Sequence, residues 1–412
     1  MIDFPASPTT GQTFTAAGVT WTWDGAKWTA NGLNVPYLPL SGGTLSGPLT
    51  LVGDPAAALQ PATKQYVDAG NVYPRDNRII NGDMRIDQRN NGASGTATGT
   101  YTVDRWFFTA SQTGKGTWQR ITSGAAGLTN GLAYNLQFVS SSAYASVATD
   151  SFNFNQRIEA DMLGDLAWGT ASAQPITLSF WFSSSVAGTY SGAIRNDTST
   201  RSYPFSFQIP QANTWTKIAV TIPGDTVGPW VLQGNAVGMY VHFDLGAGAN
   251  LRGPANAWAS ANYFGATGAV SVVGTNGATF NLTGVKLEIG SVATPFNRQS
   301  LAKSLVDCQR YCQRITTNGT NNQAFGAGFC ASASLAGIVL PYKVSMRATP
   351  TLSVSAAAGF VVNGLATNGV NPVGFGPDGM QVNLNTAASL VANSGATASV
   401  AVGNWLGLDA EL

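Results

Sequence analysis

The sequence has few charged residues. Asp, Glu, Lys and Arg make up 10% of its 412 residues, against roughly 25% in an ordinary soluble domain. Glutamate occurs only at Glu159, Glu288 and Glu411, and lysine is nearly as rare. Because both are strong helix formers, their scarcity argues against a mainly helical protein. The sequence is instead rich in Gly, Ser, Thr, Asn and Ala, which suits many short strands joined by tight turns.

Positive charge is not clustered either. The formal net charge is +1, and residues 315–412 carry only five charged side chains. A nucleic-acid-binding protein needs grouped Lys and Arg residues to displace counterions from phosphates, so we expect no nucleic-acid partner. A surface with so little charge steers ligands weakly, and binding would depend on shape, stacking and hydrogen bonds.

Cysteines and long apolar runs are also scarce. The three cysteines are too few for a disulfide scaffold and fit synthesis in a reducing bacterial cytoplasm. No run approaches the roughly 18 apolar residues of a membrane helix, and the first residues lack the basic and apolar regions of a signal peptide. We therefore expect no membrane insertion. Release by cell lysis, as for a virion protein, would explain action outside the cell.

Residues 1–35 predict a small aromatic β-module. Trp21 and Trp23 alternate with threonines, and Asp24-Gly25 forms a turn before Trp28, which is typical of a hairpin. The three tryptophans are interpreted as a small core, with a sugar-binding platform as the alternative.

Residues 36–76 predict a thin stalk. Glycines and a proline alternate with Leu45, Leu49 and Leu51, and a short helix containing Tyr66 follows. These side chains have too few neighbours in their own segment to be buried by one chain. We therefore expect them to pack against further copies of the chain.

Residues 77–298 predict an all-β domain. Alternating or continuous apolar patterns mark strands, and the apolar phase slips at Gly284, which predicts a β-bulge. Strands at this spacing without helices between them indicate a sandwich or jelly roll. The clearest strand patterns lie at residues 134–138, 176–182, 218–222, 239–245 and 278–287.

Residues 299–316 predict one linking helix, with Ser300 as its N-cap. A seam of two heptads packs either on the chain's own sandwich or along a symmetry axis. Residues 317–412 return to short strands and predict a second, smaller β-sandwich. The seam consists of Leu301, Leu305, Cys308, Cys312 and Ile315.

Several segments together resemble bacteriophage tail fibres and tail proteins that have a carbohydrate-binding-like jelly-roll domain. They occur in the expected order over most of the chain. These segments are WTWDGAKWT (21–29), GGTLSGPLTL (42–51), PATKQYVDA (61–69), RIINGDMRIDQR (78–89), YTVDRWFF (101–108), KLEIGSVATPF (286–296), CQRYCQR (308–314), MRATPTLSVS (346–355) and LDAEL (408–412).

The resemblance implies a structural protein of the virion tail, assembled as a homotrimer, that mediates attachment to the host. We expect residues 1–35 to dock onto other tail or baseplate proteins and the C-terminal domains to contact a host cell-surface glycan. The resemblance transfers no ligand and no set of binding residues. The family pattern has a second aromatic residue after CQRY, where this chain has Cys312.

Three kinds of catalytic or metal chemistry find only partial support. His242 is the chain's one histidine, and no nucleophile motif accompanies it, so we interpret it as a histidine at the surface or rim of its strand. A glycosidase needs two carboxylates across a cleft, and Asp161 with Asp165 near Trp168, or Asp83 with Asp87, are the candidates. A metal site would have Cys308, Cys312 and His242 but no further ligands.

Sugar binding needs aromatic faces beside amides and hydroxyls. Trp168, Trp230, Trp258 and Tyr263 lie in segments rich in Gly, Asn and Pro and are the candidate glycan contacts, although each also suits a role in the core or in anchoring a loop. The sequence thus predicts a glycan-binding fibre protein that is not an enzyme and needs no cofactor or metal. A polysaccharide-degrading tail enzyme and a purely architectural collar or head fibre remain alternatives.

Overall fold

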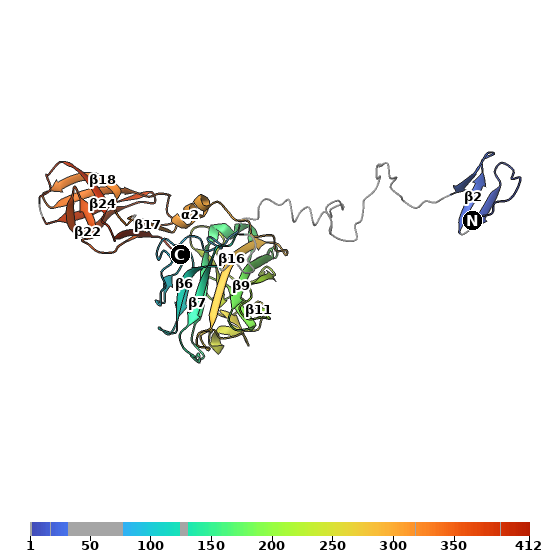
Figure 1. The fold of residues 1–412 in the computed structure, drawn as a ribbon, viewed down its shortest axis with the longest axis horizontal. Coiled ribbons are helices and arrows are strands. Elements are labelled where there is room, and N and C mark those ends of the chain that lie inside the picture. Colours follow the sequence, from blue (N-terminus) through green and yellow to red (C-terminus); the bar gives the residue numbers. More distant parts are fainter. Residues whose placement is uncertain (1, 17, 32–76, 124–130, 318, 388) are drawn as a thin grey trace. The chain divides into compact units, whose positions relative to one another are not determined.

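The computed structural model describes residues 2–16, 18–31, 77–123, 131–317, 319–387 and 389–412. The chain divides into two units, Met1–Gly70 and Asn71–Leu412, each described by itself. Almost all regular structure in the described residues is β (Figure 1), and the predicted mostly β fold is confirmed. The predicted stalk and its candidate contacts, Leu45, Leu49, Leu51 and Tyr66, lie outside the described residues.

The first unit contains a three-stranded antiparallel sheet of β1 (Thr13–Ala16), β2 (Val19–Trp23) and β3 (Trp28–Asn31). The predicted hairpin is present, with Trp23 paired to Trp28. Its turn is closed by the carboxylate of Asp24, which accepts hydrogen bonds from the backbone N–H groups of Ala26 and Lys27. Phe4 completes the small core by stacking on Trp28, with ring centroids 5.3 Å apart.

The second unit begins with a sandwich of two antiparallel sheets, the predicted jelly roll. Inward-facing aliphatic and aromatic side chains of both sheets form one buried core. The six-stranded sheet has the order β11 (Ser202–Ile209), β10 (Gly188–Asn196), β13 (Val237–Asp244), β8 (Phe152–Glu159), β5 (Phe107–Ala110) and β4 (Thr100–Tyr101). The five-stranded sheet has the order β12 (Thr216–Ile222), β9 (Ile176–Ser184), β16 (Thr279–Ile289), β7 (Tyr134–Ser140) and β6 (Gly116–Thr122).

The bulge predicted at Gly284 is present. The pairing of β16 with β9 shifts register between Thr283 and Lys286, and Gly284 has a φ of +60°, a conformation that residues with a Cβ atom rarely adopt. Short elements connect the sandwich strands. They are η1 (Ala160–Leu166), η2 (Ala249–Leu251), β14 (Arg252–Gly253) and β15 (Gly265–Ala266). Strand β15 packs against β10, β11 and β13.

The predicted linking helix is shorter than the sequence pattern indicates. Helix α2 (Leu301–Gln309) begins at the predicted cap, where the Ser300 side chain accepts a hydrogen bond from the backbone N–H of Lys303. It ends before Cys312, which starts strand β17 (Cys312–Thr316). The predicted heptad seam is therefore broken, because its last two positions lie in a strand that pairs with β25 (Trp405–Asp409).

The C-terminal part is all β, as predicted, but the predicted second sandwich is wrong. A three-stranded sheet of β17, β25 and β20 (Thr351–Val354) lies beside a closed barrel, and both contribute to one apolar core. The barrel order is β18 (Gln323–Ser332), β19 (Leu335–Pro341), β23 (Gly379–Thr386), β22 (Leu365–Phe375), β21 (Phe360–Val362) and β24 (Gly395–Val400). Strand β24 pairs with both β18 and β21 and so closes the strands into a barrel.

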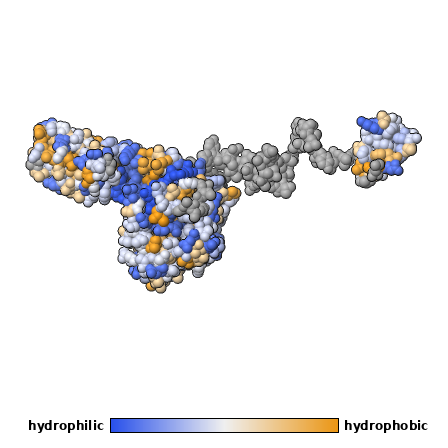
Figure 2. Space-filling model, in the orientation of Figure 1, coloured by the Kyte–Doolittle hydropathy of each residue, from blue (hydrophilic) through white to orange (hydrophobic). Residues whose placement is uncertain are grey.

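Ion pairs join the C-terminal residues to the jelly roll. Glu411 pairs with Arg89 and Arg105, and Asp409 also pairs with Arg89. Figure 2 shows hydrophilic residues gathered beside helix α2 in this part of the surface. No helix in the described residues is long and apolar enough to cross a membrane.

Candidate functional site

The structure brings three of the four predicted glycan contacts together at one edge of the jelly roll. Trp168 follows η1, Trp230 lies between β12 and β13, and Trp258 lies between β14 and β15. Their ring centroids are 4.6 to 5.7 Å apart, and each pair is nearly perpendicular, at 77° to 83°. We call Trp168, Trp230 and Trp258 the tryptophan cluster.

The three indoles differ in exposure. Trp168 is only 2% exposed, and its indole N–H donates to the carbonyl oxygen of Gln174. It therefore packs beneath the other two indoles on the core side and has no ring face accessible to a ligand. This corrects its assignment as a glycan contact. Trp230 and Trp258 are half-buried and pack against the core from its edge. Their accessible surface is what a ligand would meet.

The indole N–H groups of the two half-buried tryptophans are already hydrogen-bonded within the chain. Trp258 donates to the carbonyl oxygen of Pro223, at 2.9 Å, and Trp230 donates to Oδ2 of Asp225, at 3.0 Å. Asp225 is itself held by Arg201 through two hydrogen bonds of 2.6 and 2.8 Å. These bonds fix the ring orientations before any ligand arrives, which lowers the entropic cost of binding.

Arg201 and Asp225 are residues that the sequence reasoning missed. No motif marks the pair, because 24 positions separate them in sequence. Tyr203 was also missed, and its ring lies 5.2 Å from Trp258. Tyr263, the fourth predicted contact, packs instead over Gly253, where an added Cβ would lie 2.3 Å from the tyrosine ring. No ring contact joins it to the cluster in the described residues.

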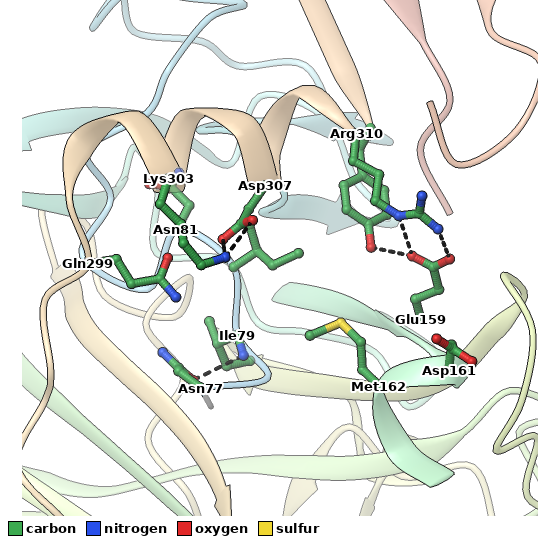
Figure 3. Close-up of a pocket in the computed structure, with 12 residues that line it drawn as sticks. Asn77, Ile79, Asn81, Glu159, Asp161, Met162, Gln299, Lys303, Asp307 and Arg310 are labelled. Atoms are coloured by element: carbon green, nitrogen blue, oxygen red, sulfur yellow. Dashed lines mark hydrogen bonds and ion pairs between the residues drawn. The ribbon is translucent and has the colours of Figure 1, made fainter. Parts of the chain in front are cut away.

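A cavity of about 480 Å³ lies elsewhere, under helix α2. Figure 3 shows Gln299, Lys303 and Asp307 on one side of it, and Asn77, Glu159 and Asp161 on the others. The predicted carboxylate pair is not assembled there. Asp161 lines the cavity, whereas Asp165 forms an ion pair with Arg78, at 2.6 Å.

Two carboxylates that line this cavity are engaged in ion pairs. Arg310 holds Glu159 through two hydrogen bonds of 2.6 and 3.2 Å, and Lys303 pairs with Asp307 at 3.0 Å. Burial acts to raise the pKa of Glu159, but hydrogen bonds from Arg310 and Tyr311 outweigh it and hold the pKa below its ordinary value. Ionised Glu159 therefore holds the segment that follows α2 in place through its bonds with Arg310 and Tyr311.

His242 is buried and not at the surface or rim that the sequence indicated. It is 3% exposed, and its ring stacks on Phe264, with centroids 4.8 Å apart. Burial lowers the pKa of His242 well below its ordinary value, and Arg195 and Arg157 lower it further. The imidazole is therefore neutral at pH 7.

The cysteines weighed as metal ligands, Cys308 and Cys312, are buried and unpaired. Burial raises the pKa of both thiols, that of Cys312 to about 12. Within the ranges that the structure describes, no group of three or more His, Cys, Asp or Glu side chains is placed to hold a metal ion.

Comparisons with known proteins give distant structural likenesses. No protein family matches the sequence, and no curated protein matches it either. A putative sugar binding protein from Bacteroides thetaiotaomicron is 16% identical, with a TM-score of 0.30, and the match covers 52% of this chain and 100% of that protein.

Two other solved structures are similar at the same level. The enzymatically active domain of tailspike protein 4 from bacteriophage CBA120 is 13% identical, with a TM-score of 0.29, over 53% of this chain and 22% of that one. TmCBM61 in complex with beta-1,4-galactotriose is 9% identical, with a TM-score of 0.27, and the match covers 52% of this chain and 99% of that one. At these identities and TM-scores, no family is assigned to the chain.

Proposed function

We propose that this chain is a structural protein of a bacteriophage tail fibre that attaches the virion to a glycan on the host surface, without enzymatic activity. The observation that carries the proposal is the tryptophan cluster. Sugar rings present apolar C–H faces, which pack on aromatic side chains. Trp230 and Trp258 supply two such side chains, and their indole N–H groups are satisfied within the chain.

Polar groups beside the rings suit the hydroxyls of a sugar. Arg201 donates through Nη1 to the hydroxyl of Ser260, at 3.0 Å, and its guanidinium carbon lies 5.8 Å from the Trp258 ring. A hydroxyl both donates and accepts hydrogen bonds, so it can join such a network. The site is small, and several copies on one virion would raise the avidity through effective concentration.

Assembly as a homotrimer is part of the proposal. It rests on the stalk sequence of residues 36–76 and on helix α2, where Leu301 is 57% and Val306 48% exposed and Leu305 is half-buried. Cys308 and Cys312 are buried inside the chain, so the helix would contact another copy through its leucines. Residues 1–35 would dock onto other tail or baseplate proteins.

A binding experiment tests the glycan proposal. The full chain is applied to an array of bacterial surface glycans, and the best ligand is then titrated against the variants Trp230→Ala and Trp258→Ala. We expect each to weaken binding by at least tenfold, because truncating a tryptophan at the centre of a binding site costs about 2 kcal/mol or more and about 1.4 kcal/mol is a factor of ten. Phe329→Ala removes an aromatic side chain that is 56% exposed on the barrel and serves as the control.

Two results would contradict the proposal. One is the absence of binding to any host envelope glycan, and the other is equal loss of binding in Phe329→Ala and Trp258→Ala. Release of oligosaccharides from host capsule or lipopolysaccharide would refute the non-enzymatic part. Sedimentation of the full chain as a single 42.7 kDa subunit at high concentration would refute the trimer.

A further inference from the structure

The outer face of the six-stranded sheet carries an unusual row of side chains. Strand β13 pairs with β10 on one side and β8 on the other, so that Tyr240 lies between Arg195 and Arg157. One step along, His242 lies opposite Asn155. Side chains alternate along a strand, and Val241 between them is fully buried in the core. These polar and aromatic side chains therefore share the face that points away from the core.

Within the described ranges, the two arginines have no Asp or Glu in direct ion-pair contact, although the charge of Asp197 acts on Arg195. Most arginines of the second unit have an Asp or Glu within 4.0 Å, but in the described residues neither Arg157 nor Arg195 forms such an ion pair. Arg195 donates through Nη1 to Ser199 and Asn262, both at 2.8 Å, and Arg157 donates to a main-chain oxygen of Leu412, the last residue of the sequence. The Nε atom of each is buried without a hydrogen-bond partner.

Aromatic rings flank both guanidinium groups. The guanidinium carbon of Arg195 lies 4.3 Å from the Tyr240 ring centroid and 5.3 Å from that of Phe264. That of Arg157 lies 4.4 Å from the Phe107 ring centroid. Arg157, Tyr240, Phe107 and Phe264 are half-buried. The face therefore places two guanidinium groups beside the partly open surfaces of several rings, and Arg195 itself is 8% exposed.

Two acceptors in the same row also lack partners. His242 Nδ1 lies 3.0 Å from Oδ1 of Asn153, and Asn155 Nδ2 donates to that same oxygen, also at 3.0 Å. Since an amide oxygen only accepts, Nδ1 of His242 carries the proton and Nε2 is a bare acceptor. Nε2 of His242 and Oδ1 of Asn155 have no partner, although each residue is 3% exposed. Unsatisfied buried polar atoms are costly, and a ligand or a water molecule that donates hydrogen bonds would satisfy them.

We propose that this face binds an acidic sugar, a pyranose with a carboxylate, in the row formed by Arg157, Tyr240 and Arg195. The carboxylate pairs with a guanidinium, which matches its planar geometry. The sugar ring packs on Tyr240, and its hydroxyls, or water held beneath them, donate toward His242 and Asn155. The site is separate from the tryptophan cluster and does not depend on glycan binding there.

Calorimetric titration of the full chain at low salt tests the proposal with three probes: trigalacturonic acid, its methyl ester and galactotriose. We expect the acid to bind at least tenfold more tightly than the ester or the neutral sugar, because only the acid carries the charge. Arg195→Gln and Arg157→Gln should bring the acid to the affinity of the ester. Trp258→Ala should leave the preference for the acid intact, which separates this site from the cluster.

Lys217→Gln is the matched control, because it removes the same charge from an exposed position on the other sheet. Equal affinity of the wild-type chain for acid and ester would overturn the proposal without any variant. So would a loss in Lys217→Gln as large as in Arg195→Gln, since that result indicates net charge alone. Binding of mannose 6-phosphate but not of trigalacturonic acid would refute a preference for carboxylates. If water alone satisfies the unpaired polar atoms of the row, none of the probes will bind, and that result would also overturn the proposal.

Discussion

The phenolic oxygen of Tyr311 lies 2.6 Å from Oε2 of Glu159, and this hydrogen bond ties the segment after helix α2 to the end of strand β8. Arg310 holds the same carboxylate from the other side. The ring of Tyr311 is also covered by the guanidinium of Arg105, whose carbon lies 3.6 Å from the ring centroid. The jelly roll and the C-terminal part are thus joined by buried charges around one tyrosine.

This arrangement predicts a dependence of stability on pH. The pKa of folded Glu159 lies below its ordinary value of 4.5, so its ionised form stabilises the fold above that pH. The stabilisation is lost as the pH falls through the folded pKa. We expect Glu159→Gln to unfold at lower urea concentration than the wild type at pH 7, and the difference to narrow as the pH falls below 4.5 and through the folded pKa. Asp161→Asn is the control, because Asp161 is exposed beside the same cavity. If Glu159 is responsible, Asp161→Asn should not remove the difference in stability between the wild type and Glu159→Gln. An unchanged midpoint in Glu159→Gln at pH 7 would contradict this reading.

Glu411 and Asp409 predict a second contrast. Both pair with Arg89, but the Glu411 side chain is 4% exposed and also pairs with buried Arg105, whereas the Asp409 side chain is 40% exposed. Removing one partner of a buried ion pair leaves an uncompensated charge, which costs about 3–5 kcal/mol. We expect Glu411→Gln to lower the free energy of unfolding by about that amount, and Asp409→Asn by less than about 1 kcal/mol. Chemical denaturation measures both, and equal losses would show that burial is not the deciding factor.

In the tryptophan cluster, we expect the buried ring to contribute mainly to stability and the half-buried rings mainly to glycan binding. Trp168 is buried, so Trp168→Ala should cost about 3–5 kcal/mol and weaken glycan binding only by displacing Trp230 and Trp258. Trp230→Ala should weaken binding with a smaller loss of stability, because its ring is half-buried. Thermal unfolding and glycan titration of the same two proteins check this. A stability loss in Trp230→Ala as large as in Trp168→Ala would mean that Trp230 acts mainly as a core residue.

Gly284 predicts the cost of altering the bulge. Its φ is +60°, and an added Cβ would lie 2.8 Å from Cδ1 of Leu132. Gly284→Ala should destabilise by more than the roughly 1–2 kcal/mol of the left-handed backbone alone. Gly277→Ala isolates that backbone contribution, because Gly277 has a φ of +75° and an added Cβ there would have no neighbour within 4 Å. Denaturation midpoints of the two variants give the difference, and equal effects would remove the contact with Leu132 as a cause.

The cysteines predict a chemical result. Cys308, Cys312 and Cys330 are all buried, and the raised pKa of Cys308 and Cys312 leaves almost no thiolate, the reactive form, at pH 8. We expect no reaction of the native chain with a thiol reagent such as Ellman's reagent, and three equivalents of reaction after unfolding. Rapid labelling of the native protein would show that one of these thiols is accessible.

Local patterns were enough to predict much of the fold. The alternation of residues 239–245 predicts β13, the apolar run at 176–182 predicts β9, and the phase slip predicts the bulge at Gly284. Each depends on neighbours within a few positions, which the sequence displays directly. The end of helix α2 was wrong because the heptad spacing continues through Cys312, whereas pairing with β25, nearly a hundred residues later, draws that residue into a strand.

The sequence by itself determined the mostly β class, the turn at Asp24-Gly25, the helix cap at Ser300 and the tryptophans that stand in loops, because strand period, turn chemistry and capping are local properties. Only the tertiary structure decided which tryptophan is buried, that His242 lies inside, and that Arg157 and Arg195 flank one tyrosine. Those outcomes depend on which strands become neighbours in the sheet, and strand pairing joins residues that no local pattern connects.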